Sequence, residues 1–126
     1  MLLIKAALRP SSIHGIGLFA LEFIHKGTEI WRFSRGLDLE LSPEEVQPLP
    51  VSVKEFLQHY GYMDYRLNRY VLCFDNARFI NHSERPNSLP DYSRDPHGVD
   101  IAIRDISAGE EITRDYRSFE KRSPGL

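Results

Sequence analysis

Three short stretches of the chain combine glycine with side chains that can hold a ligand or a reacting group. They are His14-Gly15-Ile16-Gly17-Leu18-Phe19-Ala20, Arg78-Phe79-Ile80-Asn81-His82-Ser83-Glu84-Arg85-Pro86-Asn87 and Gly109-Glu110-Glu111-Ile112-Thr113-Arg114-Asp115-Tyr116. Two close glycines let a backbone approach a ligand, although a plain turn is the commoner reason for such a pair. Asparagine, histidine and tyrosine supply hydrogen-bond donors and acceptors. Each stretch alone is a weak indication of a site.

Several kinds of site have little support. Gly15 and Gly17 lack the third glycine and the downstream acidic residue of a dinucleotide-binding turn. Asn81-His82-Ser83 matches a glycosylation acceptor, but it follows an apolar pair in a chain that shows no secretory signal. No metal site is predicted, because the histidines show no paired ligand spacing. These histidines are His14, His25, His59, His82 and His97.

A cysteine hydrolase is a distant alternative. Cys73, His82 and Asn87 are of the residue types found in cysteine proteases. Cys73 lies in the apolar run Tyr70–Phe74, however, where an inert core thiol is expected. As the single cysteine of the chain it forms no internal disulfide and no multi-cysteine zinc site, which is typical of a cytoplasmic or other reducing intracellular compartment.

The elements that must position these stretches are mostly short strands. Apolar runs predict a first strand in Met1–Leu8 and others at Gly17–Ala20, Tyr70–Phe74 and Val99–Ile103. The segments 20–32 and 102–114 resemble each other, and each has an apolar stretch, a glycine and a β-type run. Their identical positions are Ala20/Ala102, Ile24/Ile106, Gly27/Gly109, Glu29/Glu111, Ile30/Ile112 and Arg32/Arg114. We interpret them as two similar sheet corners in one β domain.

A short helical insert is predicted at about 42–61. Ser42 and Ser52 each stand at a helix cap position with glutamate three residues on. Gly61 ends the second helix, whose apolar face is formed by Val53, Phe56, Leu57 and Tyr60. The acidic residues Asp38, Glu40, Glu44 and Glu45 predict a solvated face that could steer a basic peptide. The segment 86–98, rich in proline and polar residues, is predicted to be a loop.

Composition points to one soluble domain over residues 1–126, with a tail at 117–126. The 16 basic and 18 acidic side chains leave a net charge of -2, and 41% of the residues are hydrophobic. Binding to nucleic acid through bulk charge is therefore not expected. No apolar run approaches the roughly 20 residues of a membrane span, so no membrane partner is expected either.

In this order, the three stretches resemble the SET domain of protein lysine methyltransferases. That family carries a G-x-G turn, then R-F-x-N-H-S-x-x-P-N, then G-E-E-(L/I)-T-x-D-Y, and the resemblance covers about Leu3–Phe119. It implies a mostly β, β-clip-like fold of several small sheets, in which the segment of Asp115 and Tyr116 passes beneath a loop as a C-terminal pseudoknot. Because no cysteine-rich segment flanks the core and Glu84 stands where many relatives carry cysteine, we expect a minimal, stand-alone domain without zinc.

The resemblance also implies S-adenosylmethionine as cofactor, with S-adenosylhomocysteine as its product. It assigns the backbone of Gly15, Ile16 and Gly17 to this cofactor, and Asn81 and His82 to its amino acid and adenine parts. Arg78 would meet its carboxylate or brace the loop, and Phe119 would stack on adenine.

A lysine channel with aromatic walls is the second implied feature. Tyr116 matches the tyrosine beside the transferred methyl group, and Tyr62 is the first candidate for a second catalytic tyrosine. Tyr65 and Tyr70 are further candidates for the channel, whereas Tyr60 is expected to pack on the helix face. Arg114 occupies a position that is often aromatic in relatives and can affect how many methyl groups fit.

The expected function is therefore methyl transfer to a lysine amine of a protein or peptide substrate. A SET-fold binding module that has lost catalysis is the alternative, ahead of the cysteine hydrolase. A homodimer is a further hypothesis, because few residues follow Tyr116 to close the site. In a eukaryote the compartment could be nuclear.

Overall fold

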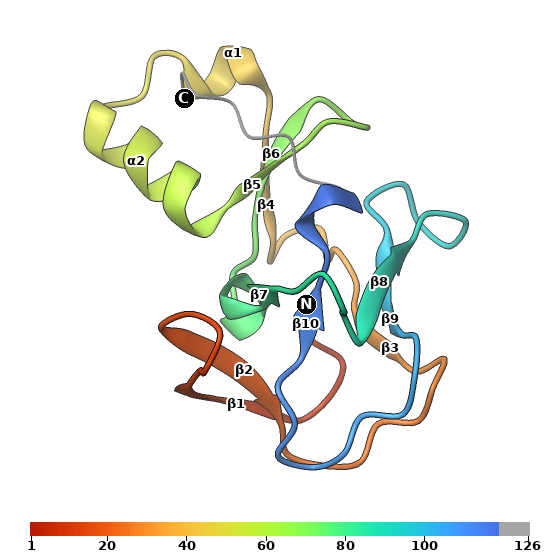
Figure 1. Cartoon of the computed structure of the whole chain (residues 1–126). Helices are drawn as coiled ribbons and strands as arrows, with labels where there is room; N and C mark the ends of the chain where they lie inside the picture. Colours follow the sequence, from red (N-terminus) through yellow and green to blue (C-terminus); the bar gives the residue numbers. More distant parts are fainter. Residues whose placement is uncertain (119–126) are drawn as a thin grey trace.

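The computed structural model describes residues 1–118, which form three small sheets with short helices (Figure 1). One is a hairpin of β1 (Ala6–Pro10) and β2 (Ile16–Ala20). The largest has the order β3 (Glu29–Trp31), β9 (Val99–Ala102), β8 (Ser88–Asp91), β10 (Thr113–Arg114) and β7 (Asn81–His82). The third contains β4 (Leu39–Leu41), β6 (Arg69–Leu72) and β5 (Tyr62–Asp64). The mostly β fold of several small sheets is confirmed.

The two similar sequence segments pair with each other. Ile24 and Ile106 exchange two backbone hydrogen bonds of 2.8 Å, and both side chains are buried. Gly27 and Gly109 take equivalent positive φ angles of +89° and +86°, which a glycine adopts without steric cost. Their N–H groups donate at 2.7 Å to the carbonyls of equivalent residues, Ala102 and Ala20 respectively. The duplicated pattern thus forms two corners that pair with each other through reciprocal backbone hydrogen bonds.

The sheets share one hydrophobic core. Its large side chains come from strands and corners far apart in sequence, and burying each stabilises the fold by about 1.5–3 kcal/mol. The largest apolar ones are Leu18, Ile24, Ile30, Trp31, Ile80, Ile106, Ile112, Val71 and Val99. Val71 of β6 belongs to this core, and Tyr62 of β5 packs against it. The sheet that carries Tyr62 and Tyr70 is therefore packed against the others.

Strand β10 passes between two strands that precede it in sequence. It pairs in parallel with β7, through Thr113 to Asn81, and with β8, through Arg114 to Ser88. The connection between β7 and β8 therefore crosses over β10, as Figure 1 shows. The buried Asn87 fastens this crossing, because its side chain donates to the Glu111 carbonyl at 2.7 Å and accepts from the Thr113 N–H at 2.9 Å. The expected pseudoknot is confirmed.

The helical insert contains α1 (Pro43–Val46) and α2 (Val51–Tyr60). Ser42 and Glu45 form the predicted capping box of α1. The predicted cap at Ser52 is wrong, because α2 begins at Val51 after an extended Pro50, which places Ser52 inside the first turn. Gly61 follows α2 as predicted. Within residues 1–118, neither helix has the length and apolar character needed to cross a bilayer.

The apolar face of α2 is only partly covered. Leu57 is buried, while Val53 and Phe56 stay 39% and 42% exposed. The face therefore packs through one side chain and through the contact of Tyr60 with the Phe79 ring, whose centroids are 6.0 Å apart.

Three other expectations from the sequence are corrected. The first strand begins at Ala6, because Leu2 and Leu3 bridge to β3 instead of continuing the hairpin. The predicted loop 86–98 contains β8, since Ser88 and its neighbours find partners along β9. Asp38 does not lie on a solvated acidic face; it is buried and accepts hydrogen bonds from the N–H groups of Ser34 and Phe74.

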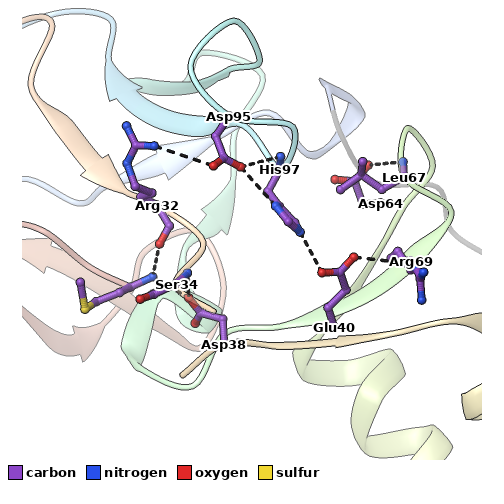
Figure 2. Close-up of polar contacts among 10 residues, drawn as sticks. Arg32, Ser34, Asp38, Glu40, Asp64, Leu67, Arg69, Asp95 and His97 are labelled. Carbon is purple, nitrogen blue, oxygen red and sulfur yellow. Dashed lines mark hydrogen bonds and ion pairs between the residues drawn. The ribbon is translucent and has the colours of Figure 1, made fainter. Parts of the chain in front are cut away.

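A polar network joins the three-stranded sheet to the β8–β9 connection (Figure 2). The His97 ring stacks on Phe33 at 3.9 Å between centroids. Its Nδ1 atom lies 3.2 Å from the Asp95 carboxylate and its Nε2 atom 3.1 Å from that of Glu40, which in turn lies 3.7 Å from Arg69. Because these residues come from separate elements, the network holds β4 and β6 against the larger sheet.

Candidate active site

The parallel pairing of β7 with β10 brings Tyr116 beside His82. The Tyr116 N–H donates to His82 Nδ1 at 3.0 Å, and the two rings lie 5.4 Å apart. The Tyr116 hydroxyl donates to the carbonyl of Ile80, the residue before Asn81. Tyr116 is therefore tied to the segment 80–82 through both its backbone and its side chain.

The hydrogen bond to His82 selects one tautomer of its ring. An imidazole nitrogen that accepts an N–H must carry a lone pair, so the neutral ring has its hydrogen on Nε2. His82 is partly exposed. It can thus offer an Nε2–H donor and an aromatic face to a ligand.

Asn81 is oriented by the glycine turn. Its Nδ2 group donates to the carbonyls of His14 and Ile16 at 3.0 and 3.2 Å, to the Glu111 carboxylate at 2.9 Å and to Ser11 Oγ at 3.3 Å. Only an NH₂ group can satisfy these acceptors, which settles the orientation of the amide. Within residues 1–118, Asn81 Oδ1 has no hydrogen-bond donor, so it is an acceptor available to a ligand.

The two glycines of the turn serve different purposes. Gly15 has a φ of +44° and open space where a side chain would begin, so its role is conformational. A Cβ atom at Gly17 would lie 2.7 Å from Cδ of Glu111 and nearer still to Oε2. Gly17 is therefore required by the close approach of the Glu111 carboxylate. Between them, Ile16 is 51% exposed.

Arg78 lies in the 3₁₀ turn η1 (Asn76–Phe79), immediately before the segment 80–82. Its guanidinium carbon is 5.4 Å from the centre of the Tyr60 ring and 5.5 Å from that of Phe79. Its Nε atom is buried and has no hydrogen-bond partner within residues 1–118. A buried donor of this kind is uncommon and fits a place where an acceptor is to be bound.

The three channel candidates do not share one face. Tyr62 lies opposite Val71 in the β5–β6 pair and packs against the core, and burial raises the pKa of its phenol. Tyr70 is next to Val71 on β6, so its side chain points to the opposite face of the sheet. Tyr65 follows β5 and is 47% exposed. Phe119, the expected partner of adenine, lies outside the described residues.

A buried ion pair beside the site has no counterpart in the sequence analysis. Arg114 Nη1 donates to Asp100 Oδ2 at 2.7 Å, and both side chains are almost fully buried. Burial is the largest single influence and acts to lower the pKa of Arg114, but the Asp100 carboxylate together with the Cys73, Tyr62 and Tyr116 side chains raises that pKa overall. The Tyr62 and Tyr116 side chains lie within electrostatic range of this guanidinium. The alternating pattern of β9 carried no signal for it, because β9 is a central strand and buries Asp100 as well as Val99.

The cysteine hydrolase alternative is wrong. Cys73 is 2% exposed, and burial raises the pKa of its thiol to about 12. A thiol in this environment stays protonated at neutral pH, so it is not a nucleophile.

Comparison with known proteins finds a matching family model and two similar relatives. A family model described as SET domain matches residues 15–117. "Putative histone-lysine N-methyltransferase 1" of Plasmodium falciparum is 33% identical over 90% of this chain, which spans 2% of that relative. Histone-lysine N-methyltransferase ATX2 of Arabidopsis thaliana is 30% identical over 91% of this chain, which spans 11% of that relative. The chain thus corresponds to a small part of both relatives.

Solved structures share the fold. A "putative histone methyltransferase" of Plasmodium falciparum superposes with a TM-score of 0.64 and 24% identity, over 90% of this chain and 93% of that one. Polycomb Repressive Complex 2 of Chaetomium thermophilum, in an apo autoinhibited state, gives a TM-score of 0.69 and 26% identity, over 94% of this chain and 16% of that one. With the family match over most of the chain and the same fold in these neighbours, the chain belongs to the SET domain family.

Proposed function

We propose that this domain transfers a methyl group from S-adenosylmethionine to the side-chain amine of a lysine in a protein or peptide. The observation that carries the proposal is the meeting of the glycine turn, Asn81, His82 and Tyr116 at one place. The names of the two relatives support a lysine substrate, and the structure of the Chaetomium complex bound to S-adenosylmethionine, at a TM-score of 0.65, supports the cofactor.

The described residues fit this cofactor chemically. When bound, S-adenosylmethionine supplies a methyl group carried on a positively charged sulfur. Asn81 Oδ1 would accept from its ammonium group, and the buried Arg78 Nε would donate to its carboxylate. His82 would offer its Nε2–H, and the exposed turn residues Gly15 and Ile16 would lie against the ligand. Phe119 stays a proposed stacking partner for adenine.

Tyr116 is the proposed catalytic residue because its hydroxyl hydrogen is already committed. With that hydrogen donated to Ile80, the oxygen can act only as an acceptor toward the site. A neutral lysine amine that donates an N–H to this oxygen is held in one orientation. Its lone pair is then free to point toward the methyl group, so the proposed contribution of Tyr116 is alignment of the amine. Lysine has a pKa near 10.4 in water, and an apolar channel beside a cation lowers that value, so the neutral form becomes available.

Tyr62 is the proposed second tyrosine of the site, with Tyr65 and Tyr70 as further proposed channel residues. The same burial that raises the pKa of the Tyr62 phenol gives it an apolar surrounding, which suits a wall that disfavours an ammonium ion. The partly buried position of Tyr62 against the core supports its choice over the exposed Tyr65.

The experiment that tests the proposal is Tyr116→Phe, read by methyl transfer and by calorimetry with S-adenosylhomocysteine. We expect turnover to fall by about a hundredfold or more, as when one preorganised polar group is removed, while cofactor affinity changes by less than about threefold. Tyr92→Phe is the matched control, because Tyr92 packs under Arg66 at 3.9 Å in the β8–β9 connection, and its turnover should stay at the wild-type level. Loss of both turnover and binding in Tyr116→Phe would instead indicate a structural role.

Assays of the wild-type protein alone distinguish the proposed enzyme from the alternative, a SET-fold binding module. A binding module would take up S-adenosylhomocysteine without transferring labelled methyl groups to proteins of a mixed extract. Mass spectrometry of the labelled proteins would then identify the substrate, and the relatives' names make histone proteins the first to try.

Compartment, assembly and extent are parts of the same proposal. A single, buried Cys73 supports a reducing compartment, cytoplasmic or nuclear. We propose that residues 1–126 act as one domain with the tail 117–126, without direct nucleic acid or membrane partners. The proposed homodimer is measured by sedimentation of the wild-type chain.

A further inference from the structure

The carboxylate of Glu111 joins two segments that are distant in sequence. Its Oε1 atom accepts from Ser11 Oγ at 2.7 Å, and its Oε2 atom accepts from Asn81 Nδ2 at 2.9 Å. Ser11 and Asn81 also contact each other, with Nδ2 at 3.3 Å from Oγ. The three side chains thus form a closed hydrogen-bonded triangle, which we call the turn clamp.

Each partner of Glu111 in the turn clamp holds the glycine turn. Ser11 donates its N–H to the Gly15 carbonyl at 2.8 Å, and its Oγ accepts from the N–H groups of Ile13 and His14 at 3.0 and 3.3 Å. Asn81 binds the far side of the same turn through the carbonyls of His14 and Ile16. The conformation of residues 11–16 therefore depends on two side chains that Glu111 fixes relative to each other.

The carboxylate also lies directly against the backbone of the turn. The absence of a side chain at Gly17 is what lets Cδ and Oε2 of Glu111 approach. A carboxylate accepts at both oxygens, which matches one donor from Ser11 and one from Asn81. A carboxamide at this position would put an NH₂ group against one of these donors.

The second sheet corner shows that the corner itself does not need this arrangement. Glu29 is the equivalent of Glu111 in the duplicated pattern, and the backbones of both bridge a strand, to Ile101 and to Phe19 respectively. The Glu29 side chain binds instead the guanidinium groups of Arg94 and Arg32, at 2.8 and 3.3 Å, at the protein surface. The contacts of the Glu111 side chain are thus a property of the site and not of the corner.

We propose that Glu111 is a positioning residue, which through Ser11 and Asn81 holds the glycine turn and Asn81 Oδ1 in the geometry that binds the cofactor. This inference rests on the proposed function and deepens it, because it adds a group that acts on the cofactor site without contacting the reacting atoms. It predicts that removing the charge of Glu111 weakens cofactor binding and leaves the chemistry at saturating cofactor unchanged.

The test is Glu111→Gln, with the adjacent Glu110→Gln as matched control. Glu110 contacts Arg104 at 2.6 Å and Asn87 at 3.3 Å and is not part of the turn clamp. Calorimetry with S-adenosylhomocysteine should show about tenfold weaker binding or more for Glu111→Gln, the factor expected for one lost hydrogen bond to a charged group. Glu110→Gln should stay within about twofold of wild type.

Two further readouts separate positioning from general destabilisation. In Glu111→Gln the KM for S-adenosylmethionine should rise about tenfold while kcat stays within about twofold, and hydrogen exchange should accelerate at the amides of Ile13 and His14. Neither change is expected in Glu110→Gln. Ser11→Ala removes the other end of the turn clamp and should weaken binding in the same direction, which keeps the test decisive if Glu111→Gln does not fold.

The outcomes distinguish the two proposals. Wild-type affinity for S-adenosylhomocysteine in both Glu111→Gln and Ser11→Ala would overturn the turn clamp and leave the proposed function intact. A fall in apparent kcat with an unchanged KM would also overturn it, because that pattern indicates loss of folded enzyme and not weaker cofactor binding. If the wild-type protein itself binds no S-adenosylhomocysteine, the proposed function fails, and with it the role given to Glu111.

Discussion

Replacement of Asp100 by asparagine is the sharpest test of the energetic reasoning. Arg114 and Asp100 are 2.7 Å apart, with side-chain exposures of 6% and 3%. Asp100→Asn keeps the shape and removes the charge, so the guanidinium stays buried without its counter-charge. Breaking a buried pair in this way costs about 3–5 kcal/mol. For a chain of 126 residues this lowers Tm by about 10–20 °C, because the unfolding entropy is about 2.1 cal/mol/K per residue.

The assay is thermal and urea unfolding followed by circular dichroism, with an exposed pair of the same length as control. Arg94 Nε and Asp91 Oδ2 lie 2.9 Å apart, but their side chains are 39% and 27% exposed. Asp91→Asn should therefore cost less than about 1 kcal/mol. The two pairs are similar in distance and charge, but Arg94 also keeps Glu29 at 2.8 Å, so the difference between the variants measures burial together with the lack of a second carboxylate partner at Arg114.

A paired replacement completes the test. Asp100→Leu together with Arg114→Met leaves no uncompensated charge, and the stability should recover to within about 1–2 kcal/mol of wild type. Equal, small losses in Asp100→Asn and Asp91→Asn would refute the reasoning, because they would mean that water reaches the Arg114 guanidinium. A double variant no more stable than Asp100→Asn would refute it as well.

Two further predictions concern titratable groups whose pKa values are shifted in opposite directions. Burial raises the pKa of the Cys73 thiol to about 12, so this thiol should resist iodoacetamide in the native protein at pH 8 and react fully in urea. Mass spectrometry of the labelled protein measures both reactions. Rapid labelling of the native protein would contradict the burial of Cys73. Hydrogen bonds from the Arg117 side chain lower the pKa of Asp115 to about 2. This pairing therefore stabilises the folded protein fully at pH values above the ordinary carboxyl pKa near 3.9, and its contribution is lost as the pH falls toward 2. A carbon NMR titration should give a midpoint near 2 for Asp115, moving up in Arg117→Gln, and an unchanged midpoint would rule out Arg117 as the cause.

Local patterns in the sequence were sufficient to predict the site motifs and several boundaries of the helices. The capping box of Ser42 and Glu45 and the stop at Gly61 depend on residues within one or two turns of helix, so neighbouring residues decide them. The duplicated corners were also visible, because each needs a glycine with positive φ at a defined distance from an apolar residue. The threaded crossing followed only from the resemblance to the SET domain, since no local pattern encodes it.

Tertiary structure alone decided where the polar side chains of the interior are and what they bind. Asp38, Asp100 and Asn87 have the residue types of surface loops and strand faces, yet they are buried because their partners come from distant segments. The strand β8 exists for the same reason, as its ladder with β9 outweighs a sequence rich in turn formers.

The turn clamp shows most directly which side-chain contacts the sequence alone does not predict. The sequence motifs single out Gly15, Gly17 and Asn81, and the order of the motifs indicates a common site, but they give no role to Ser11 or Glu111. That Glu111 meets Ser11, 100 residues away, depends on β10 entering the sheet beside β7, which is a property of the whole chain's packing. Residue type and spacing therefore determined which chemistry was available, and long-range pairing determined which groups perform it, because hydrogen-bond partners are selected by proximity in space.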